Sequence, residues 1–382
     1  MTARKLTGPA LTALALAALC AGCGSTAAAS QPRRSATAPA LAMSLADAEA
    51  TSQAAWAVLP MGSTSGPNQF WQLFLDAGRG WRLDTPPDIA TNGAVELAGL
   101  SGASLTTGVR PSLYLTYSPV SSTADGKNWT AGPPAAGLAD VPDALAATAG
   151  GRLLALSTKG DVSSAGVTAP SWRPLISARE LGAGAGRSCK LIAITAVAYS
   201  PAGDPVAGAS CRSDGVAGVF EQTSIGWRAA GPALPAALAG DETRVLRLVT
   251  TSAGMTALIQ AGTGPSASLL AAWRPPGGAW TVSAPLTLGT AVVRTSSFGA
   301  AGSAAVVLSG QRAETISGPG ATWHGTPTLP AGRNLVIALP AAEPVTALAA
   351  GAGTVTIWRL TGGGQWALSQ KINVPIQYGS SG

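Results

Sequence analysis

The sequence predicts an all-β protein: a seven-bladed β-propeller of four-stranded antiparallel blades, preceded by a signal peptide and a flexible tether. Two observations predict this fold. A tryptophan recurs after a glycine-rich or small-residue turn, and short apolar segments are separated by glycine and proline pairs, as in strands joined by tight turns. The recurring tryptophans are Trp81, Trp129, Trp172, Trp227, Trp280, Trp323 and Trp366.

The intervals between these tryptophans are 48, 43, 55, 53, 43 and 43 residues, and propeller blades repeat at about 40 to 50 residues. The unit that ends near Trp280 divides into four expected strands, at 244–251, 255–260, 268–273 and 280–283. A large aromatic at the same place in each blade can pack between neighbouring blades, so we expect core tryptophans rather than a ligand platform. A tandem of β-sandwiches is the alternative, but seven markers at this period favour the propeller.

The turn before Trp129 resembles the Asp-box of sialidase-like propellers, which joins the third and fourth strands of a blade. Ser122, Gly126 and Trp129 are in register with the motif, whereas the acidic residue, Asp125, stands one position late. The other turns keep at most the glycine and the tryptophan. The resemblance, to Asp-box and WD-repeat-like seven-bladed propellers, implies an architecture and a stabilised turn, and it implies no active site.

The N-terminus has the order of a secretory signal: a basic start at Arg4 and Lys5, an apolar run over 11–19, then small residues. The run is shorter than the roughly 20 residues that span a bilayer. After it, Ala, Ser, Thr and Pro dominate, which is typical of a flexible tether. We therefore expect a signal peptide over 1–22, a lipidated cysteine and linker over 23–50, and the propeller domain over 51–382.

The residues around Cys23 resemble the bacterial lipobox, in which small residues precede a cysteine that is acylated and becomes the first residue of the mature chain. Ala21, Gly22 and Cys23 match the pattern, and Cys20 stands where leucine is preferred. The resemblance implies a lipid anchor on Cys23 and a position on the outer side of the bacterial cytoplasmic membrane. The alternatives are cleavage before Cys20, an ordinary signal peptide with a chance cysteine, and an uncleaved anchor.

Charged residues form only 11% of the chain and hydrophobic residues 46%, which excludes a disordered protein. The formal charge of +6 falls to +4 when the two basic residues Arg4 and Lys5 leave with the signal. The remaining Lys and Arg form no basic run, so we expect no nucleic-acid partner.

Two cysteines lie in the expected domain, Cys189 and Cys211. The residues between them predict a strand over 191–199, a turn, and a second strand over 205–209. Folding this hairpin brings its ends within disulfide reach, and an exported location permits oxidation. We expect a disulfide, because a metal or redox site would need further ligands and the only histidine, His324, is far away in sequence.

No catalytic, metal or cofactor site is predicted. A sialidase would need three arginines, a tyrosine–glutamate pair and an aspartic acid, and no residue aligns with them. A quinone-dependent dehydrogenase would need calcium ligands and a cofactor-stacking face, and a serine hydrolase would depend on His324. Glycoside hydrolysis by two carboxylates stays open, since the chain has 18 acidic residues.

Charged residues gather in the loops from each expected fourth strand to the next first strand, which share one face of a propeller. As a binding face we select Arg179, Arg187, Asp241, Arg244 and Arg333. The same loops also carry Asp84, Asp88, Asp140, Asp143, Glu180, Glu242 and Asn334. The alternative is that polar residues belong in loops whatever their function.

These observations predict a lipid-anchored, non-catalytic binding or scaffold module for a protein or a cell-envelope polymer, with no cofactor. The alternatives are a degenerate sialidase-like or other glycan-processing enzyme and a lipoprotein partner of a membrane complex. An enzyme needs acids and arginines at the channel mouth, and a charge-poor mouth would exclude it. The ring could be closed by a strand within 40–58 or by the tail at 372–378.

We expect Cys23→Ser to release a folded, soluble protein from the membrane, because the lipid on Cys23 is the predicted membrane anchor. The measurement is the fraction of the protein that sediments with membranes. Persistent sedimentation of the variant would contradict this interpretation of the N-terminus.

Overall fold

The computed structural model describes fifteen segments of the chain, all within the second of two compact units, 1–37 and 38–382. The described residues are 48–51, 53–62, 69–85, 93–99, 105–111, 120–131, 143–148, 150–166, 172–212, 215–251, 254–299, 302–329, 333–340, 344–351 and 353–374. The signal peptide, Cys23, and Asp88 and Asp140 lie outside them. No helix within the described segments is long and apolar enough to cross a membrane.

The strands follow one another as four-stranded antiparallel meanders. The first three are β1 (Ala48–Ala50), β2 (Ala55–Gly62), β3 (Gln69–Asp76), β4 (Trp81–Leu83); β5 (Gly93–Gly99), β6 (Leu105–Pro111), β7 (Val120–Thr123), β8 (Trp129–Ala131); and β9 (Ala144–Ala147), β10 (Arg152–Leu156), β11 (Asp161–Gly166), β12 (Arg173–Ser177). The next two are β13 (Leu191–Tyr199), β14 (Pro205–Cys211), β15 (Val219–Thr223), β16 (Gly226–Ala229); and β17 (Thr243–Thr251), β18 (Gly254–Ala261), β19 (Ser268–Arg274), β20 (Thr281–Val282). The last two are β22 (Val293–Phe298), β23 (Ala304–Leu308), β24 (Arg312–Ile316), β25 (His324–Gly325); and β26 (Arg333–Ala338), β27 (Thr346–Ala350), β28 (Thr354–Leu360), β29 (Trp366–Asn373).

Five meanders are separate sheets, whereas the fourth and fifth share a nine-stranded sheet because the end of β14 pairs with the start of β17. A short additional strand, β21 (Leu286–Thr287), pairs with β19 in the same sheet. One α-helix, α1 (Ala178–Ala183), and two short 3₁₀ turns, η1 (Ala236–Leu238) and η2 (Gly264–Ser266), also occur in the described part. The expectation of an all-β protein is therefore confirmed apart from this connecting helix.

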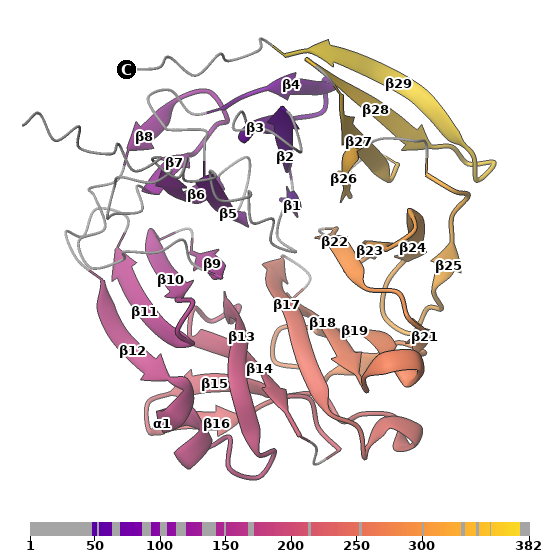
Figure 1. Cartoon of the computed structure of the whole chain (residues 1–382). Coiled ribbons are helices and arrows are strands. Elements are labelled where there is room, and N and C mark those ends of the chain that lie inside the picture. Colours follow the sequence, from indigo (N-terminus) through magenta and orange to yellow (C-terminus); the bar gives the residue numbers. More distant parts are fainter. Residues whose placement is uncertain are drawn as a thin grey trace, which may run out of the picture. The chain divides into compact units, whose positions relative to one another are not determined.

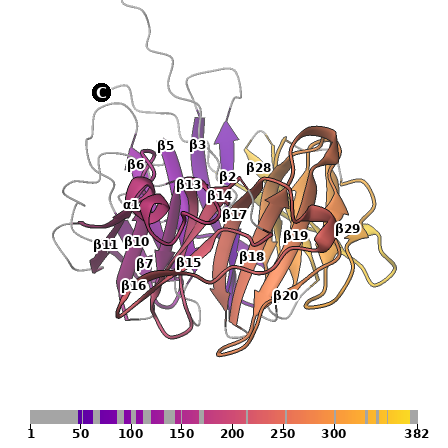
Figure 2. The same cartoon turned by 90° about the horizontal axis from the view of Figure 1, so that it is seen from below.

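The meanders follow each other around a ring within the unit 38–382, with their first strands innermost and their fourth strands outermost (Figure 1). First strands contact their neighbours in sequence from β5 to β9 to β13 to β17, and β22 contacts β26. Figure 2 shows the strands edge-on, with turns at both ends of the sheets. This is a β-propeller arrangement.

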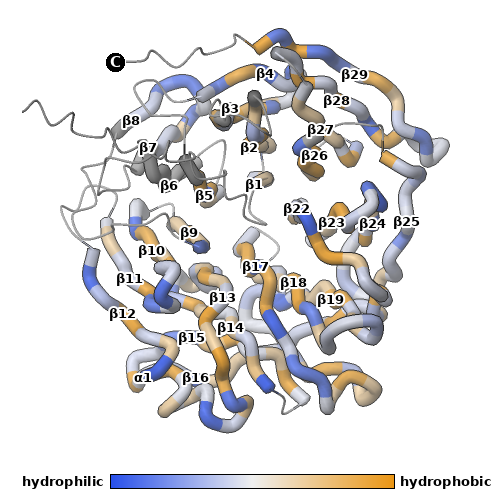
Figure 3. Tube along the Cα trace, viewed as in Figure 1, coloured by the Kyte–Doolittle hydropathy of each residue, from blue (hydrophilic) through white to orange (hydrophobic). Residues whose placement is uncertain are grey.

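Among the described residues the core comprises seven apolar clusters, six between meanders that are consecutive in sequence and one between the first and the last. Each of the six contains a recurring tryptophan of the later meander, whereas the cluster between the first and last meanders contains Trp81 of the first. Trp129, for example, packs edge to face on Trp56 of the preceding meander, with 5.9 Å between ring centroids. Figure 3 shows hydrophobic positions along the inner strands, while the exposed outer strand β25 is hydrophilic.

The tryptophans lie at the start of the fourth strands with small deviations from the expected position. Trp81, Trp129 and Trp366 open β4, β8 and β29, whereas Trp172, Trp280 and Trp323 precede their strands by one residue and Trp227 follows the start of β16. Trp81 is 2% exposed and the others are partly buried. The indole N–H groups of Trp280 and Trp366 donate to backbone oxygens of the preceding meander, at 2.6 and 3.0 Å. In these two residues the ring faces bury apolar area while the polar edge is satisfied.

The N-terminal strand completes the first meander, so the predicted boundary at residue 51 is wrong by at least three residues. β1 pairs with β2 in register Ala48↔Ala57 to Ala50↔Ala55. Its two alanines have the composition of a tether, which is why composition placed them in the linker. Of the two ways of closing the ring, the one within 40–58 is the one observed.

The first and last meanders join by side-chain contacts. Their shared apolar cluster includes Phe74, Trp81 and Ile357. The Gln370 side chain on β29 accepts from Trp81 N at 3.1 Å and donates to Trp81 O at 2.7 Å, continuing the pattern of a β-ladder. No strand is exchanged between the two ends of the chain, since each described meander is contiguous in sequence.

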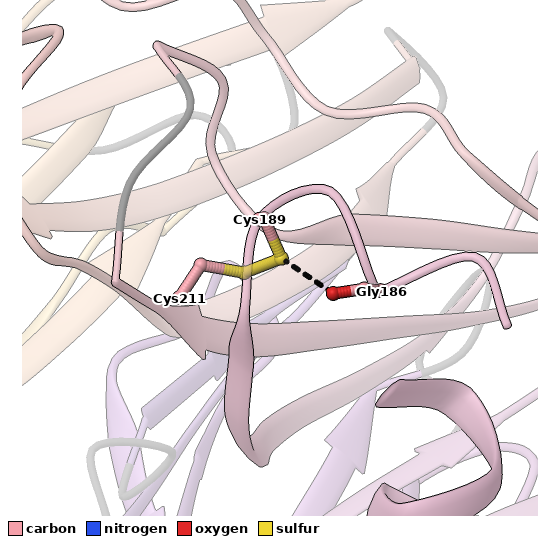
Figure 4. The surroundings of a disulfide bond; sticks show 3 residues. All are labelled: Gly186, Cys189 and Cys211. Atoms are coloured by element: carbon pink, nitrogen blue, oxygen red, sulfur yellow. Dashed lines mark hydrogen bonds between the residues drawn. A yellow bond between two sulfur atoms is a disulfide. The ribbon is translucent and has the colours of Figure 1, made fainter. Parts of the chain in front are cut away.

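The expected disulfide between Cys189 and Cys211 is confirmed (Figure 4). Leu191 faces Cys211 in the β13–β14 ladder, so the bond closes the open end of this hairpin. The Cα atoms are 5.3 Å apart, which is within the usual range. The carbonyl oxygen of Gly186 contacts Cys189 Sγ at 3.5 Å, which fixes the connection that follows α1 against the hairpin.

Replacing both cysteines, Cys189→Ala with Cys211→Ala, should lower the free energy of unfolding by about 3 kcal/mol, because the bond closes a loop with a sequence separation of 22. The measurement is denaturant unfolding of the oxidised protein, of the reduced protein and of the variant. Equal stability of the oxidised and reduced forms would show that the bond does not restrain the unfolded chain.

Candidate functional site

The alternating strand directions divide the connections between two faces. Connections from fourth to first strands and from second to third strands share one face, which we call the loop face. Connections from first to second and from third to fourth strands share the other, which we call the turn face. The predicted binding residues Arg179, Arg187 and Asp241 lie in connections of the loop face, and Arg244 and Arg333 lie at the starts of first strands there.

The connection from β12 to β13 begins with α1. Ser177 Oγ accepts from Glu180 N at 3.2 Å, and the Glu180 carboxylate accepts from Ser177 N at 2.9 Å, a reciprocal capping box. Glu180 therefore stabilises the helix start, and these hydrogen bonds lower the pKa of its carboxyl. The Arg187 guanidinium donates to Ala183 O at 2.8 Å at the other end of the helix. Arg179 is exposed.

The disulfide connects two of the predicted binding segments. Arg212 N donates to Cys189 O at 3.0 Å, and the next ladder pair, Ser210 with Arg244, joins β14 to β17. The exposed side chains of Arg187 and Arg244 thus flank one cross-linked junction of the loop face. Arg333 starts β26, in the last meander, and its side chain lies outside the described residues. The five predicted residues are therefore not shown to form one patch.

Asp84 also faces a connection of the loop face, directly after β4. Partial burial raises the pKa of the Asp84 carboxyl to about 6. The Arg82 guanidinium donates to Asp84 Oδ1 at 3.4 Å and opposes this rise in pKa. The same Arg82 side chain donates to Gly126 O of the next meander at 2.5 Å. Arg82 and Asp84 consequently connect the first two meanders.

The axis of the ring contains a buried ion pair that the sequence did not predict. Arg247 on β17 is 5% exposed, and its guanidinium donates to Glu49 Oε1 of β1 at 2.5 Å and to Ala48 O at 2.6 Å. It also bonds Ser296 of β22 through the backbone oxygen and, at 3.2 Å, the hydroxyl. One arginine side chain therefore joins the first strands of three meanders.

Two cavities of about 40 Å³ each lie beside Glu49, toward opposite faces, and each has room for one to about three water molecules. Glu96, Asp143 and Arg247 line one of them. Burial raises the pKa of the Glu49 carboxyl, and Arg247 opposes that shift. The described part of the channel therefore combines charged groups with apolar side chains.

A sequence signal for these residues exists. Glu49 and Glu96 are the only charged residues of β1 and β5, and Arg247 lies among apolar residues of β17, three positions after Arg244. Charged side chains in such segments are rarely buried unless they are paired. Residues of opposite charge in two innermost strands could therefore have been proposed as partners across the channel, although no spacing identifies which strands face each other.

The turn that resembles an Asp-box is held by its acidic residue. Asp125 Oδ1 accepts from Lys127 N at 2.9 Å and Asn128 N at 2.8 Å, and these bonds hold the pKa of its carboxyl well below the usual range. Gly126 has φ +67°, and a Cβ there would lie 2.4 Å from Leu75 Cδ2. The turn therefore requires glycine and carries a structural role.

The described residues contain no group of three His, Cys, Asp or Glu placed to hold a metal ion. His324 is exposed on β25, 3.4 Å from the Thr322 hydroxyl. It lies on the outermost strand of its meander, far from the innermost strands that form the channel (Figure 1).

Solved structures with the same fold include three with TM-scores above 0.5. The β-propeller domain of Cps50 (Swd1) from Myceliophteria thermophila has a TM-score of 0.54 at 11% identity, covering 83% of this chain and 97% of that one. The periplasmic gluconolactonase PpgL from Pseudomonas aeruginosa has 0.53 at 13%, covering 84% and 97%. A protein from Lactobacillus plantarum has 0.51 at 12%, covering 85% and 97%.

No family model matches the sequence, and no curated protein matches it. At such low identities the similar structures show the fold alone. The chain folds as a β-propeller, a class whose rigid ring presents loops at its faces.

We expect Arg247→Met to lower the free energy of unfolding by about 3 to 5 kcal/mol, because Glu49 would stay buried without its counter-charge. Adding Glu49→Gln should recover part of this loss, since the double replacement removes both charges. Denaturant unfolding of the two variants measures the difference.

Arg312→Met provides the control. Arg312, whose side chain is 49% exposed, pairs at 3.1 Å with Glu314, whose side chain is 9% exposed, so the loss of Arg312 should cost less than that of the buried Arg247. Equal effects of Arg247→Met and Arg312→Met would contradict the role of the channel ion pair.

Proposed function

We propose that the protein is a lipid-anchored, extracytoplasmic propeller that acts as a non-catalytic binding or scaffold module for a protein or a cell-envelope polymer. The observation that carries the proposal is the Arg247–Glu49 pair in the channel. Ligand pockets usually enclose about 300 to 1,000 Å³, whereas the cavities beside this pair are about 40 Å³ each. Binding on the outer surfaces of the ring is therefore the better supported role.

The loop face is the surface that we assign to the partner. Its junction presents Arg187 from the β12–β13 connection and Arg244 from the start of β17. Before binding, the disulfide restrains the Arg187 segment against β14, which pairs with β17 beside Arg244. Restraint of this kind reduces the entropy that association costs. The lipid at Cys23 and the tether after it would hold this face near the membrane.

One observation favours the enzyme alternative. Carboxyl groups of Glu49, Glu96 and Asp143 line the same small cavity as Arg247. Two carboxylates can hydrolyse a glycoside when a sugar fits between them. An enzyme would require the channel to open, so hydrolysis of a panel of chromogenic glycosides by the wild type but not by Glu96→Gln would establish it.

Charge reversal at the loop face tests the proposed role. We expect Arg179→Glu with Arg244→Glu to weaken retention on envelope fractions by about tenfold, corresponding to about 1.4 kcal/mol, because both side chains are exposed on that face. The assay compares full-length lipidated protein, solubilised in detergent, on isolated cell wall and on membrane extract.

Arg79→Glu with Lys127→Glu is the matched control, since it changes the net charge equally at exposed positions of the turn face. Its retention should equal that of the wild type. Loss of retention in both variants, or in neither, would argue against the loop face as the binding surface.

A further inference from the structure

A groove of about 680 Å³ opens at the turn face between the third and fourth meanders. The third meander contributes the start of β10, the end of β11 and the start of β12. The fourth contributes the end of β13, the start of β14 and the end of β15. β10 contacts β13, so the two walls belong to neighbouring sheets within one ring (Figure 1). The volume is within the range of small-molecule sites.

Two arginines face this groove without a carboxylate partner among the described residues. Arg152 donates to Gly203 O at 2.5 Å, and its guanidinium lies 5.0 Å from the centre of the Tyr199 ring. Arg173, the first residue of β12, is exposed and makes no ion pair within the described segments. The hydrogen bond and the aromatic contact hold Arg152 in place, so one guanidinium is fixed and the other is free to close on a ligand.

The rest of the lining is mixed: Ala165, Gly166, Leu175 and Pro205 are apolar, and Asp204 is the one acid. Ser164, Gln222, Thr223 and Ser224 supply hydroxyl and amide groups that both donate and accept hydrogen bonds. Burial raises the pKa of the Tyr199 phenol to about 12, and Arg152 opposes that shift. A lining that combines hydroxyl and amide groups with apolar and aromatic surface suits a sugar, which presents hydroxyl groups and C–H faces.

Asp204 limits the charge of the ligand. It lines the same groove at the start of β14 and pairs with neither arginine. Guanidinium groups match carboxylates and phosphates in geometry, but a doubly charged phosphate would meet the Asp204 carboxylate. A singly charged carboxylate on a sugar satisfies the arginines with less repulsion.

We propose that this groove binds a saccharide that carries a carboxylate group, a uronic acid unit of an acidic glycan. The carboxylate lies between Arg152 and Arg173, and the sugar hydroxyls bond the polar residues of β11 and β15. The site is separate from the loop face and rests on the proposed function only in that the protein binds its ligand without converting it.

Calorimetric titration of the full-length protein in detergent tests the proposal, with trigalacturonate and a glucuronate oligosaccharide as probes. At least one uronate should bind, and galactotriose, which lacks the carboxylate, should not. Arg173→Gln should weaken binding by about tenfold, as expected for the loss of a charged hydrogen bond. Asp204→Asn should strengthen it, because a like charge is removed.

Arg79→Gln, at another exposed position of the turn face, should bind the uronate like the wild type. Absence of binding by both uronates, equal binding by Arg173→Gln, or preferential binding of a glycerol phosphate oligomer would overturn the proposal. Thermal unfolding checks that Arg173→Gln remains folded.

The two proposals fail separately. The loop-face variant Arg179→Glu with Arg244→Glu should keep its affinity for the uronate. If the uronate binds and this variant keeps its envelope retention, the loop-face proposal is wrong and the groove proposal stands. If this variant loses envelope retention and no uronate binds, the groove proposal is wrong and the loop-face proposal stands.

Discussion

The guanidinium of Arg247 determines how the centre of this propeller is built. A buried charge is tolerated only when hydrogen bonds and an opposite charge compensate its lost hydration. Arg247 obtains both from strands that are distant in sequence, Glu49 and Ala48 on β1 and Ser296 on β22. β1 has only three residues, so this interaction supplies much of what positions the N-terminal strand in the ring.

The described surfaces away from the axis offer two further features. Apolar contacts that include a recurring tryptophan join neighbouring meanders. The packing between sheets is therefore repeated around the ring, whereas the connections between strands differ in length and sequence. The disulfide joins two connections on the loop face, and an arginine-lined groove opens on the turn face. Lipid anchoring would present both faces outside the cytoplasmic membrane.

Local patterns in the sequence predicted the repeated meanders and the disulfide. The tryptophan period predicted the meanders, and the hairpin between Cys189 and Cys211 predicted the disulfide, because turn chemistry and strand periodicity act over short distances. The interaction of Glu49 with Arg247 joins residues 198 apart, and the groove combines side chains of two sheets. Both depend on how sheets face each other, which no local spacing encodes. Composition likewise assigned β1 to the tether because Ala48 and Ala50 are small.

Hydrogen exchange of the amides of β1, compared with those of the central strand β18, tests most directly whether the ring is closed through its N-terminal strand. Innermost strands that are held by buried contacts exchange only when the fold opens widely. The closed ring predicts that β1 amides are protected to an extent close to that of β18. Exchange of β1 at the rate of an unstructured peptide, with β18 still protected, would contradict closure by Arg247 and Glu49.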